Sequence, residues 1–297
     1  MKVGVVGVGT MGMHHVRIYH ELSCELAGIA DLNPQVKELA RKYKTSYYRD
    51  YRDLLTKVEA VSIAVPTSRH KDVALDFLQE GVHCLIEKPV TADLKSAREI
   101  AAKAKQRRVK VLVGHIERFN PAVQKLKEII EEKILGDLIM ISAKRVGPFV
   151  WRTKDVGAIV DSATHDIDVM RFLMGKEPEI VFAKKGSYRH EKDDHAVIVL
   201  DFGQTMAAIE VNWFTPHKIR NLVVTGSKGI AYVDYLEQKV EVHSPKYKLL
   251  ANITKEEPLK LEIKHFLECI SNDQEPLISA EEGIKTLQIA LQAAGSL

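Results

Sequence analysis

Four side chains with acid–base chemistry fall within one short stretch, residues 161–168 (DSATHDID), and three of them share a helical spacing. Asp161 precedes His165 by four residues and Asp168 follows it by three, so on a helix the three side chains share one face. A carboxylate beside an imidazole orients the ring and stabilises its protonated form, which suits a general base near neutral pH. Two other interpretations stay open: Asp161 or Ser162 caps a helix while His165 packs, or the two acids and His165 ligate a metal ion.

Lys88 is a second candidate for chemistry, because Glu87-Lys88-Pro89 directly follows a short apolar run. An ammonium group at this place can bind a substrate hydroxyl and stabilise the negative charge that develops on its oxygen. The alternative is that Lys88 has no catalytic role and is a surface lysine paired with Glu87. Pro89 is also a candidate for a cis peptide bond.

The first twelve residues predict the nucleotide site that such groups would serve. A short apolar run leads into Gly7-x-Gly9-x-x-Gly12 and a helix-like stretch follows, which is the setting that the dinucleotide-binding fingerprint requires. Gly7 allows the tight turn, Gly9 lets a pyrophosphate approach the backbone, and Gly12 lets the helix pack against the strand. The amides near Thr10 and Met11 are expected to face the phosphates.

A second predicted strand, Glu25–Ala30, ends in Asp31, which stands 19 residues after Gly12. The acid that binds the adenosine ribose is expected at about 20 residues. Its carboxylate accepts hydrogen bonds from a 2′-hydroxyl and repels a 2′-phosphate, and no Arg follows at once, so we expect NAD rather than NADP. The alternative is a glycine-rich turn, with Asp31 capping the helix that follows Pro34.

Composition narrows the class of protein. A chain of 297 residues with 45% hydrophobic residues is long enough for two domains with sizeable cores. A net charge of +3 is too small to indicate nucleic acid, and no apolar run reaches the ~18 residues of a membrane span. Cys24, Cys84 and Cys269 are scattered, which favours neither a disulfide framework nor a structural metal. We expect a cytoplasmic protein without a resident metal.

Residues 1–118 alternate strand and helix, which predicts a doubly wound parallel sheet. Ligands of such sheets bind at the carboxyl ends of the strands. Polar or turn residues follow four of these predicted ends: Asp31, Pro66-Thr67, Glu87-Lys88-Pro89 and Gly114-His115.

Residues 119–297 have a different pattern, with runs of strands, which predicts an α+β domain with a large open, mainly antiparallel sheet. Hairpin turns are expected at 203–204 and 227–229. The expected helices cover 121–135, 162–174, 259–270 and 280–294.

Taken together, the motifs resemble the Gfo/Idh/MocA oxidoreductase family over essentially the whole chain. The elements are the glycine fingerprint, Glu87-Lys88-Pro89, Gly114-His115-x-x-Arg118-Phe119-Asn120-Pro121 and Asp161-x-x-x-His165, in the family's order. The resemblance implies a Rossmann domain, an open-sheet domain, bound NAD or NADP and a sugar or polyol substrate. It also implies a homodimer or homotetramer formed through the outer sheet face, and catalysis by Lys88, Asp161 and His165.

Three positions depart from the common pattern of the family. Ala163 stands where a glycine is frequent, His115 where a tyrosine is frequent, and residues 157–160 replace a glycine run. Within the family, residues 114–121 and 164–168 are most similar to the branch that oxidises the 3-hydroxyl of UDP-N-acetylglucosamine.

The resemblance implies two sets of binding residues. The cofactor set is Gly7, Gly9, Thr10, Met11, Gly12, Asp31, Pro66, Thr67, His70, Glu87, Lys88 and His115. The substrate set is Lys88, Arg118, Asn120, Arg152, Asp161 and His165. A diphosphate would also need cations, for which the candidates are Arg145, Arg152, Lys154, Lys218 and Arg220, each otherwise an ordinary solvated charge.

The mechanism expected from these residues is a hydroxyl oxidation. His165, oriented by Asp161, takes the hydroxyl proton, Lys88 binds the same oxygen, and NAD supplies the hydride acceptor. The competing interpretations are a dehydrogenase of inositol or a free aldose, a non-catalytic NAD-responsive regulator, and a metal-dependent hydrolase.

Overall fold

The computed structural model describes residues 1–149, 156–189 and 191–296, which form two compact units. Unit 1 consists of Met1–His115 and Leu259–Lys285, and unit 2 of Ile116–Pro258 and Thr286–Leu297. This division differs from a single boundary between 118 and 119, because α7 (Pro258–Ser271) and the first part of α8 (Ala280–Ala293) pack in unit 1. No helix of the described residues is long and apolar enough to cross a membrane.

Unit 1 contains a six-stranded parallel sheet with the order β3-β2-β1-β4-β5-β6. This order is that of a Rossmann fold, with the switch point between β1 and β4. The strands are β1 (Lys2–Val6), β2 (Glu25–Ala30), β3 (Ser46–Tyr48), β4 (Ala60–Ile63), β5 (His83–Glu87) and β6 (Val111–Gly114). The central strand β4 is buried along its whole length, as the continuous apolar pattern predicts for a sheet covered on both faces.

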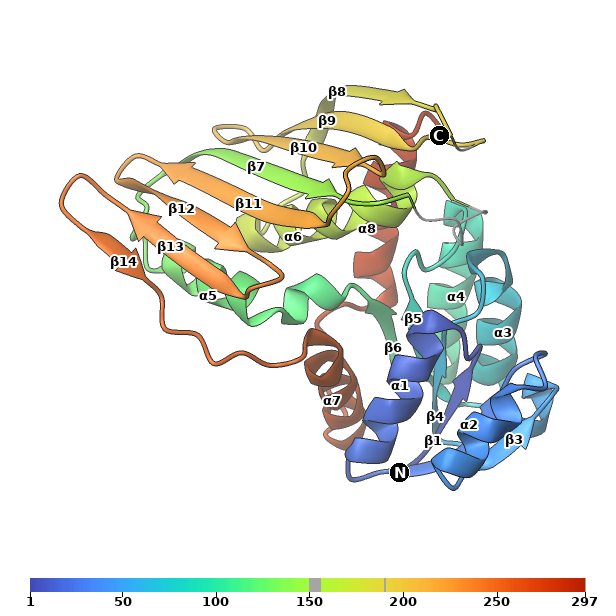
Figure 1. The fold of residues 1–297 in the computed structure, drawn as a ribbon. Helices are drawn as coiled ribbons and strands as arrows, with labels where there is room; N and C mark the ends of the chain where they lie inside the picture. Colours follow the sequence, from blue (N-terminus) through green and yellow to red (C-terminus); the bar gives the residue numbers. More distant parts are fainter. Residues whose placement is uncertain (150–155, 190, 297) are drawn as a thin grey trace. The chain divides into compact units, whose positions relative to one another are not determined.

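Helices cover both faces of this sheet (Figure 1). Right-handed crossovers place α1 and α2 on one face and α3 and α4 on the other. They are α1 (Thr10–Glu21), α2 (Val36–Lys42), α3 (Thr67–Gln79) and α4 (Leu94–Arg107). The returning helix α7 lies beside α1, where Lys260 and Glu21 form an ion pair at 3.0 Å. The open edge of β6 is covered by the segment before α8, because the Val113 amide donates to the Ile278 carbonyl at 3.0 Å.

Unit 2 contains an eight-stranded sheet with the order β14-β13-β12-β11-β7-β10-β9-β8. Its strands are β7 (Leu138–Val146), β8 (Glu179–Gly186), β9 (His195–Asp201), β10 (Met206–Asn212), β11 (Ile219–Gly226), β12 (Gly229–Asp234), β13 (Lys239–His243) and β14 (Lys248–Leu250). β7 and β10 pair in parallel and the other neighbours are antiparallel. The predicted fold class is therefore confirmed for both sheets.

One face of this sheet carries α5 (Pro121–Glu131) and α6 (Thr164–Met174), as Figure 1 shows. A buried row of apolar residues crosses that face: Leu200, Ala207, Ile141, Val224, Ala231 and Val242. The alternate residues point outward, so the period of two seen in the sequence matches a half-covered sheet.

Short elements depart from the sequence expectation. β3 and β14 have three residues each and little or no buried surface, so the sequence has no apolar pattern that predicts them. The helix expected from Ser162 begins at Thr164, after a π-helical turn over Ile159–Ala163. Such turns are frequent at functional sites.

Candidate functional site

The glycine loop has the geometry that a dinucleotide requires. Gly7 has a φ of +82°, and a Cβ there would lie 2.6 Å from the Val65 nitrogen. At Gly12 a Cβ would lie 1.9 Å from the Gly7 carbonyl oxygen, so α1 can pack this closely only without a side chain. At Gly9, by contrast, a Cβ would meet no heavy atom of the described residues within 4 Å. Open space at this position, at the N-terminus of α1, fits a pyrophosphate.

The Asp31 carboxylate is held beside the same loop. One oxygen accepts a hydrogen bond from the Val8 amide at 2.6 Å and the other from the Asn33 amide at 2.8 Å. The hydroxyl of Tyr47 donates to the Asp31 carbonyl at 2.9 Å. Asp31 therefore has a fixed orientation at the end of β2, and does not cap the first turn of α2.

A buried polar network lies beneath the end of β5. His15 is fully buried on α1, with Nδ1 2.9 Å from the Ser62 hydroxyl and Nε2 3.0 Å from a Glu87 oxygen. The Tyr19 hydroxyl lies 2.8 Å from the Ser62 hydroxyl, and burial raises the pKa of Tyr19. Burial alone would raise the pKa of Glu87, but the hydrogen bond and charge of His15 outweigh it and lower that pKa. We call these four residues the His15 network.

Lys88 directly follows this network. The second Glu87 oxygen accepts from the Lys88 amide at 3.3 Å, so the acid supports the lysine backbone. The Lys88–Pro89 bond is cis, and the Lys88 side chain is half-buried. Both Glu87 oxygens make hydrogen bonds within unit 1, and the cofactor role expected for Glu87 stays a prediction.

His70 joins the two loops that follow β4 and β5. Its ring nitrogens lie 2.8 Å from the Val65 carbonyl and 3.0 Å from the Pro89 carbonyl, and the side chain is 1% exposed. Burial lowers the pKa of His70. The ring thus fixes the backbone next to Lys88. Of the other predicted cofactor residues near it, Pro66 is exposed, while Thr67 and His115 are buried.

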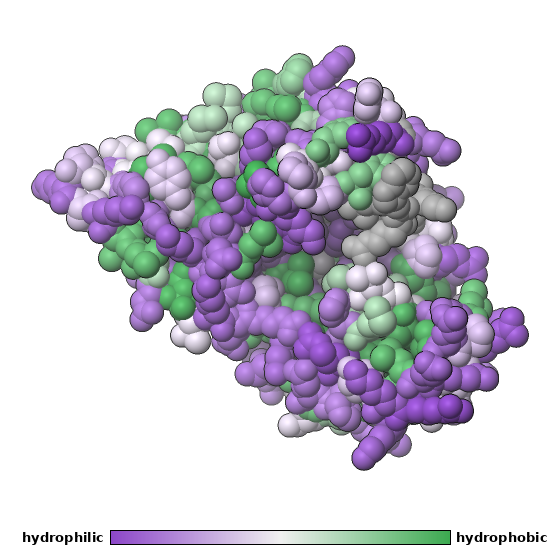
Figure 2. All heavy atoms as spheres, in the orientation of Figure 1, coloured by the Kyte–Doolittle hydropathy of each residue, from purple (hydrophilic) through white to green (hydrophobic). Residues whose placement is uncertain are grey.

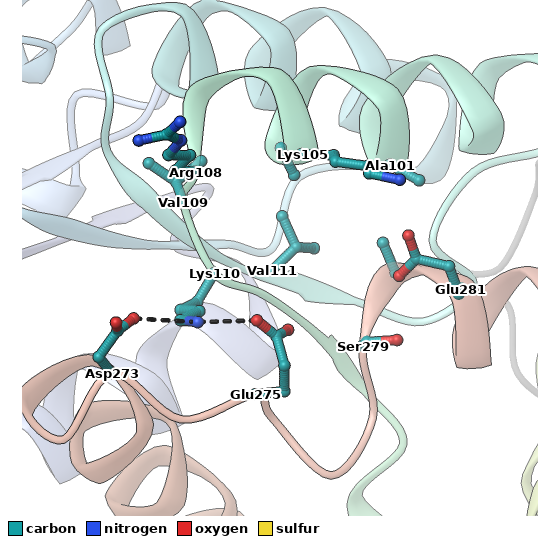
Figure 3. Close-up of a pocket in the computed structure, with 12 residues that line it drawn as sticks. Ala101, Lys105, Arg108, Val109, Lys110, Val111, Asp273, Glu275, Ser279 and Glu281 are labelled. Carbon is teal, nitrogen blue, oxygen red and sulfur yellow. Dashed lines mark hydrogen bonds and ion pairs between the residues drawn. The ribbon is translucent and has the colours of Figure 1, made fainter.

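A cavity of about 410 Å³ in unit 1 lies elsewhere, between α4 and the segment that joins α7 to α8. Lys110 crosses it and pairs with Asp273 at 3.1 Å and Glu275 at 2.7 Å (Figure 3). Among the described residues, its lining includes no predicted site residue, and it reaches Val111, at the amino end of β6. Rossmann ligands bind at the opposite, carboxyl end of the strands, so this cavity is not the cofactor site.

In unit 2 the candidate catalytic segment is anchored by Asp193. Its carboxylate accepts from the Ile159 amide at 2.8 Å, and its carbonyl accepts from the Ala158 amide at 2.7 Å. A Cβ at Gly157 would lie 2.3 Å from that carboxylate, so glycine is required there. The Thr164 hydroxyl donates to the Val160 carbonyl at 2.6 Å, which satisfies a backbone group of the π-helical turn.

Asp161 and His165 lie on this anchored segment and are both half-exposed. The Ser162 hydroxyl donates to the Asp161 carboxylate at 3.1 Å, and the Trp213 indole donates to the Ser162 oxygen at 3.1 Å. The α-helix α6 continues from the π-helical turn with Ala163 at its N-cap, so neither Asp161 nor Ser162 occupies the cap position. The sequence indicated Ser162 only as a possible helix cap, and neither Ser162 nor Trp213 is among the predicted site residues.

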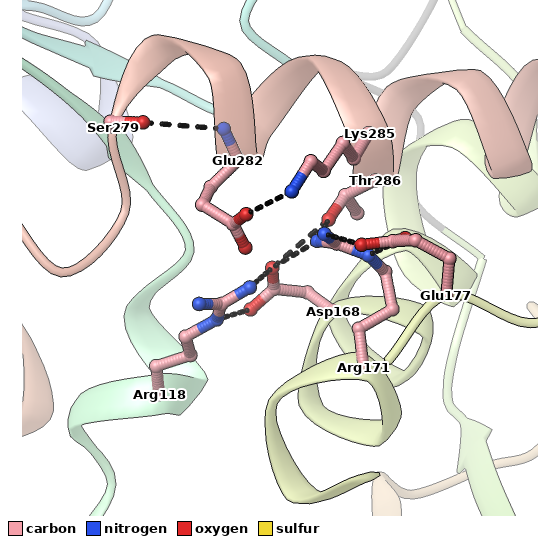
Figure 4. Close-up of polar contacts among 8 residues, drawn as sticks. All are labelled: Arg118, Asp168, Arg171, Glu177, Ser279, Glu282, Lys285 and Thr286. Carbon is pink, nitrogen blue, oxygen red and sulfur yellow. Dashed lines mark hydrogen bonds and ion pairs between the residues drawn. The ribbon is translucent and has the colours of Figure 1, made fainter. Parts of the chain in front are cut away.

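Asp168 does not join them. It is 1% exposed and makes a bidentate ion pair with Arg118, at 2.7 and 2.8 Å, and it also accepts from Thr286 at 3.0 Å (Figure 4). Arg171 extends the cluster to Glu177. Arg118, which the sequence analysis expected at the substrate, is only 4% exposed and forms its ion pair with Asp168 in the core of unit 2.

Asn120 is also buried, at 2% exposure. Its side chain accepts from the Ala122 amide at the start of α5 and donates to Glu117 and to the Tyr235 carbonyl. The structure thus gives Asn120 a capping contact rather than a free amide.

The two arginines predicted to bind a diphosphate, Arg145 and Arg220, differ in how exposed their side chains are. Arg145 is buried and paired with Asp166 at 2.7 Å and Glu117 at 3.0 Å. Arg220, opposite it in the β7–β11 pairing, keeps 35% of its side chain exposed and lies 3.7 Å from Glu117. Burial and the charge of Arg145 lower the pKa of Arg220, while Glu117, Asp166 and Asp161 act to raise it. Arg220 therefore lies within electrostatic range of Asp161.

Two of the predicted cations, Arg152 and Lys154, lie outside the described residues. Within the part of the chain that the structure describes, no group of three or more His, Cys, Asp or Glu side chains is arranged to hold a metal ion.

A Rossmann sheet with an intact glycine loop, joined to an open-sheet unit with an acid and a histidine on one anchored turn, defines an NAD-binding oxidoreductase. Residues 1–115 match the model of the oxidoreductase family GFO_IDH_MocA with its NAD-binding Rossmann fold, and residues 123–232 match the C-terminal domain of the same family. The chain belongs to the Gfo/Idh/MocA family, as its motifs indicated.

Known relatives of the chain act on sugars and polyols. UDP-N-acetylglucosamine 3-dehydrogenase from Acidithiobacillus ferrooxidans is 31% identical over 98% of this chain and 96% of its own length. Its crystal structure superposes with a TM-score of 0.92, covering 100% of this chain and 97% of that one. The scyllo-inositol 2-dehydrogenase (NAD(+)) of Bacillus subtilis is 25% identical over 100% of this chain and 94% of its own length. The chain is an oxidoreductase of the sugar and polyol dehydrogenase type.

Proposed function

We propose that this protein is an NAD-dependent dehydrogenase that oxidises the 3-hydroxyl of UDP-N-acetylglucosamine, or of a related UDP-sugar, to a ketone. The observation that carries the substrate is the 31% identity to a UDP-N-acetylglucosamine 3-dehydrogenase over 98% of the chain. The half-exposed Asp161 and His165 supply the acid–base pair that such an oxidation needs.

In the proposed reaction, His165 accepts the proton of the substrate hydroxyl, and Asp161 stabilises the imidazolium that forms. The Lys88 ammonium donates a hydrogen bond to the same oxygen and stabilises its developing negative charge. NAD held at the glycine loop would supply the hydride acceptor for this oxidation.

The NAD preference rests on Asp31. Its carboxylate is fixed by the Val8 and Asn33 amides at the end of β2, where it would receive a 2′-hydroxyl and repel a 2′-phosphate. Equal affinity for NAD and NADP would contradict this part of the proposal.

Arg220 is the described cation that best suits the diphosphate of the substrate. It is the partly exposed member of the Arg145–Arg220 pair and lies in electrostatic range of Asp161. A guanidinium matches phosphate oxygens with two parallel hydrogen bonds.

A second candidate function is oxidation of an inositol. It is favoured by relatives such as the myo-inositol 2-dehydrogenase of Thermotoga maritima, which is 24% identical over 100% of this chain. An inositol has no diphosphate, so the two candidates differ in whether Arg220 contributes to the Michaelis constant.

The test is NADH formation by the purified protein with UDP-N-acetylglucosamine, free N-acetylglucosamine and myo-inositol, each with NAD and with NADP. We expect turnover with the nucleotide sugar and NAD, and a rise in KM of about tenfold or more in Arg220→Met. Arg220→Lys keeps a positive charge and serves as the matched control. Turnover of myo-inositol alone, with no effect of Arg220→Met, would establish the second candidate instead.

We also propose that the protein forms a homodimer or homotetramer through the outer face of the eight-stranded sheet. A row of paired residues crosses that face: Phe182, Val199, Ala208, Ser142, Val223 and Tyr232. Phe182 and Tyr232 are 52% and 44% exposed, and Figure 2 shows hydrophobic side chains over β8 and β9. Contiguous apolar surface of this kind marks an interface.

A cytoplasmic location is part of the proposal. Cys24, Cys84 and Cys269 are free thiols in the structure, which suits a reducing compartment that contains NAD.

A further inference from the structure

A chain of three groups leads from the core of unit 2 to Asp161. The Trp213 indole is 3% exposed and lies 3.1 Å from the Ser162 hydroxyl, which in turn lies 3.1 Å from an Asp161 oxygen. Trp213 is itself fixed, because its amide donates to the Asp194 carbonyl at 3.1 Å and its ring meets Phe149 edge to face. The three groups come from β10's end and the π-helical turn, which are far apart in sequence.

The direction of both hydrogen bonds follows from chemistry. An indole N–H only donates and an ionised carboxylate only accepts. The Ser162 oxygen must therefore accept from Trp213, and its single proton is directed at Asp161. The hydroxyl loses its usual freedom to rotate, so the carboxylate receives a donor of fixed position.

We propose that Ser162 and Trp213 are positioning residues that hold Asp161 ionised and correctly oriented beside His165. This inference rests on the proposed function, in which Asp161 stabilises the imidazolium of His165. A hydrogen bond donated to a carboxylate favours its charged form, and a fixed orientation keeps the charge directed at the ring.

Other charged groups near this segment set the background against which the chain acts. Arg220 on β11 is within electrostatic range of Asp161, and behind it lie Arg145, Glu117 and Asp166. The Asp193 carboxylate caps the start of the π-helical turn from the β8–β9 connection. The variants at Ser162 and Trp213 change none of these charged side chains, so they test the Trp213–Ser162–Asp161 hydrogen bonds separately.

The kinetic test compares Ser162→Ala and Trp213→Phe with Ser162→Thr, which keeps the hydroxyl. We expect each of the first two variants to lower kcat about three- to tenfold, the equivalent of one hydrogen bond. The acidic limb of kcat/KM should move to lower pH by about half to one unit, because a less well oriented Asp161 carboxylate stabilises the His165 imidazolium less and His165 then holds its proton less tightly. The double variant should be no worse than Ser162→Ala, and the affinity for NAD should be unchanged.

Wild-type pH profiles in both variants, or additive effects in the double variant, would overturn the inference while leaving the dehydrogenase function intact. A wild type without turnover would instead remove the proposed function, and a second readout then still decides the inference. The indole N–H signal of Trp213, identified by its loss in Trp213→Phe, should shift in NMR spectra as Asp161 is protonated. This titration should vanish in Ser162→Ala and in Asp161→Asn. If it persists in Ser162→Ala, Ser162 does not connect Trp213 to Asp161 and the inference is wrong.

Discussion

The two compact units prepare their reactive groups in different ways. In unit 1 the shape of the cofactor loop depends on glycines without a Cβ, because a Cβ at Gly12 would lie 1.9 Å from the Gly7 oxygen. Lys88 of the same unit follows the buried Glu87, which is 8% exposed. In unit 2 Asp161 and His165 are partly exposed, and Asp161 accepts a hydrogen bond from the Ser162 hydroxyl. Binding a large cofactor calls for a rigid, pre-shaped surface, whereas proton transfer needs groups that water and substrate reach.

Two histidines give the sharpest test of this difference. His165→Ala should lower kcat by about 10²–10⁴, because it removes the proposed base, while the affinity for NAD and the melting temperature stay unchanged. His15→Ala should instead lower the melting temperature, since it leaves Glu87 and Ser62 buried without their partner. Steady-state kinetics, NAD titration and thermal unfolding of both variants measure the contrast; full activity of His165→Ala would exclude it from the mechanism.

Two glycines separate packing from ligand binding within unit 1. Gly12→Ala should destabilise the fold by about 1–3 kcal/mol, because its Cβ meets backbone that cannot move away easily. Gly9→Ala should leave stability unchanged but weaken NAD binding about tenfold or more, because its methyl group fills the open space. Denaturant unfolding and NAD titration distinguish the two, and equal effects in both assays would contradict the proposed place of the pyrophosphate.

An effect of similar size that disappears in acid is expected at Glu87. The pKa of Glu87 is lowered in the fold, so its ionised form contributes stability above the unfolded pKa, and this contribution is lost as pH falls through the folded value. Glu87→Gln should therefore be less stable than the wild type at pH 7, by about 1–3 kcal/mol, and the difference should shrink below about pH 4. Urea unfolding at pH 7, 5 and 3.5 checks this; a difference that is constant with pH would show that the charge does not matter.

Local patterns were sufficient for the fold class. The glycine spacing and the strand that ends in Asp31 predicted the Rossmann unit, and β2 lies at the predicted residues, because buried strands require continuous or alternating apolar residues. The acid and the histidine at 161 and 165 came from the same reasoning about spacing. Whether they act on a substrate stays a prediction.

Contacts between distant segments were beyond such patterns. Arg118 lies in a conspicuous motif, yet its partner is Asp168, 50 residues later. Ser162 and Trp213 are 51 residues apart, and His15 meets Glu87 across 72. Each of these pairs depends on the fold. The sequence does show a histidine about one turn after Gly12, which is the signal that could have indicated the His15 network. Periodicity alone does not reveal the partners of that histidine.

The hydrogen bond between Val113 and Ile278 has a consequence for biosynthesis. The strands of the Rossmann sheet are made before residue 258, but among the described residues the segment that pairs with the edge of β6 follows that position. Until that segment is translated, the nascent sheet presents an open edge to which other chains can pair. The first unit to be synthesised is thus among the last to be completed.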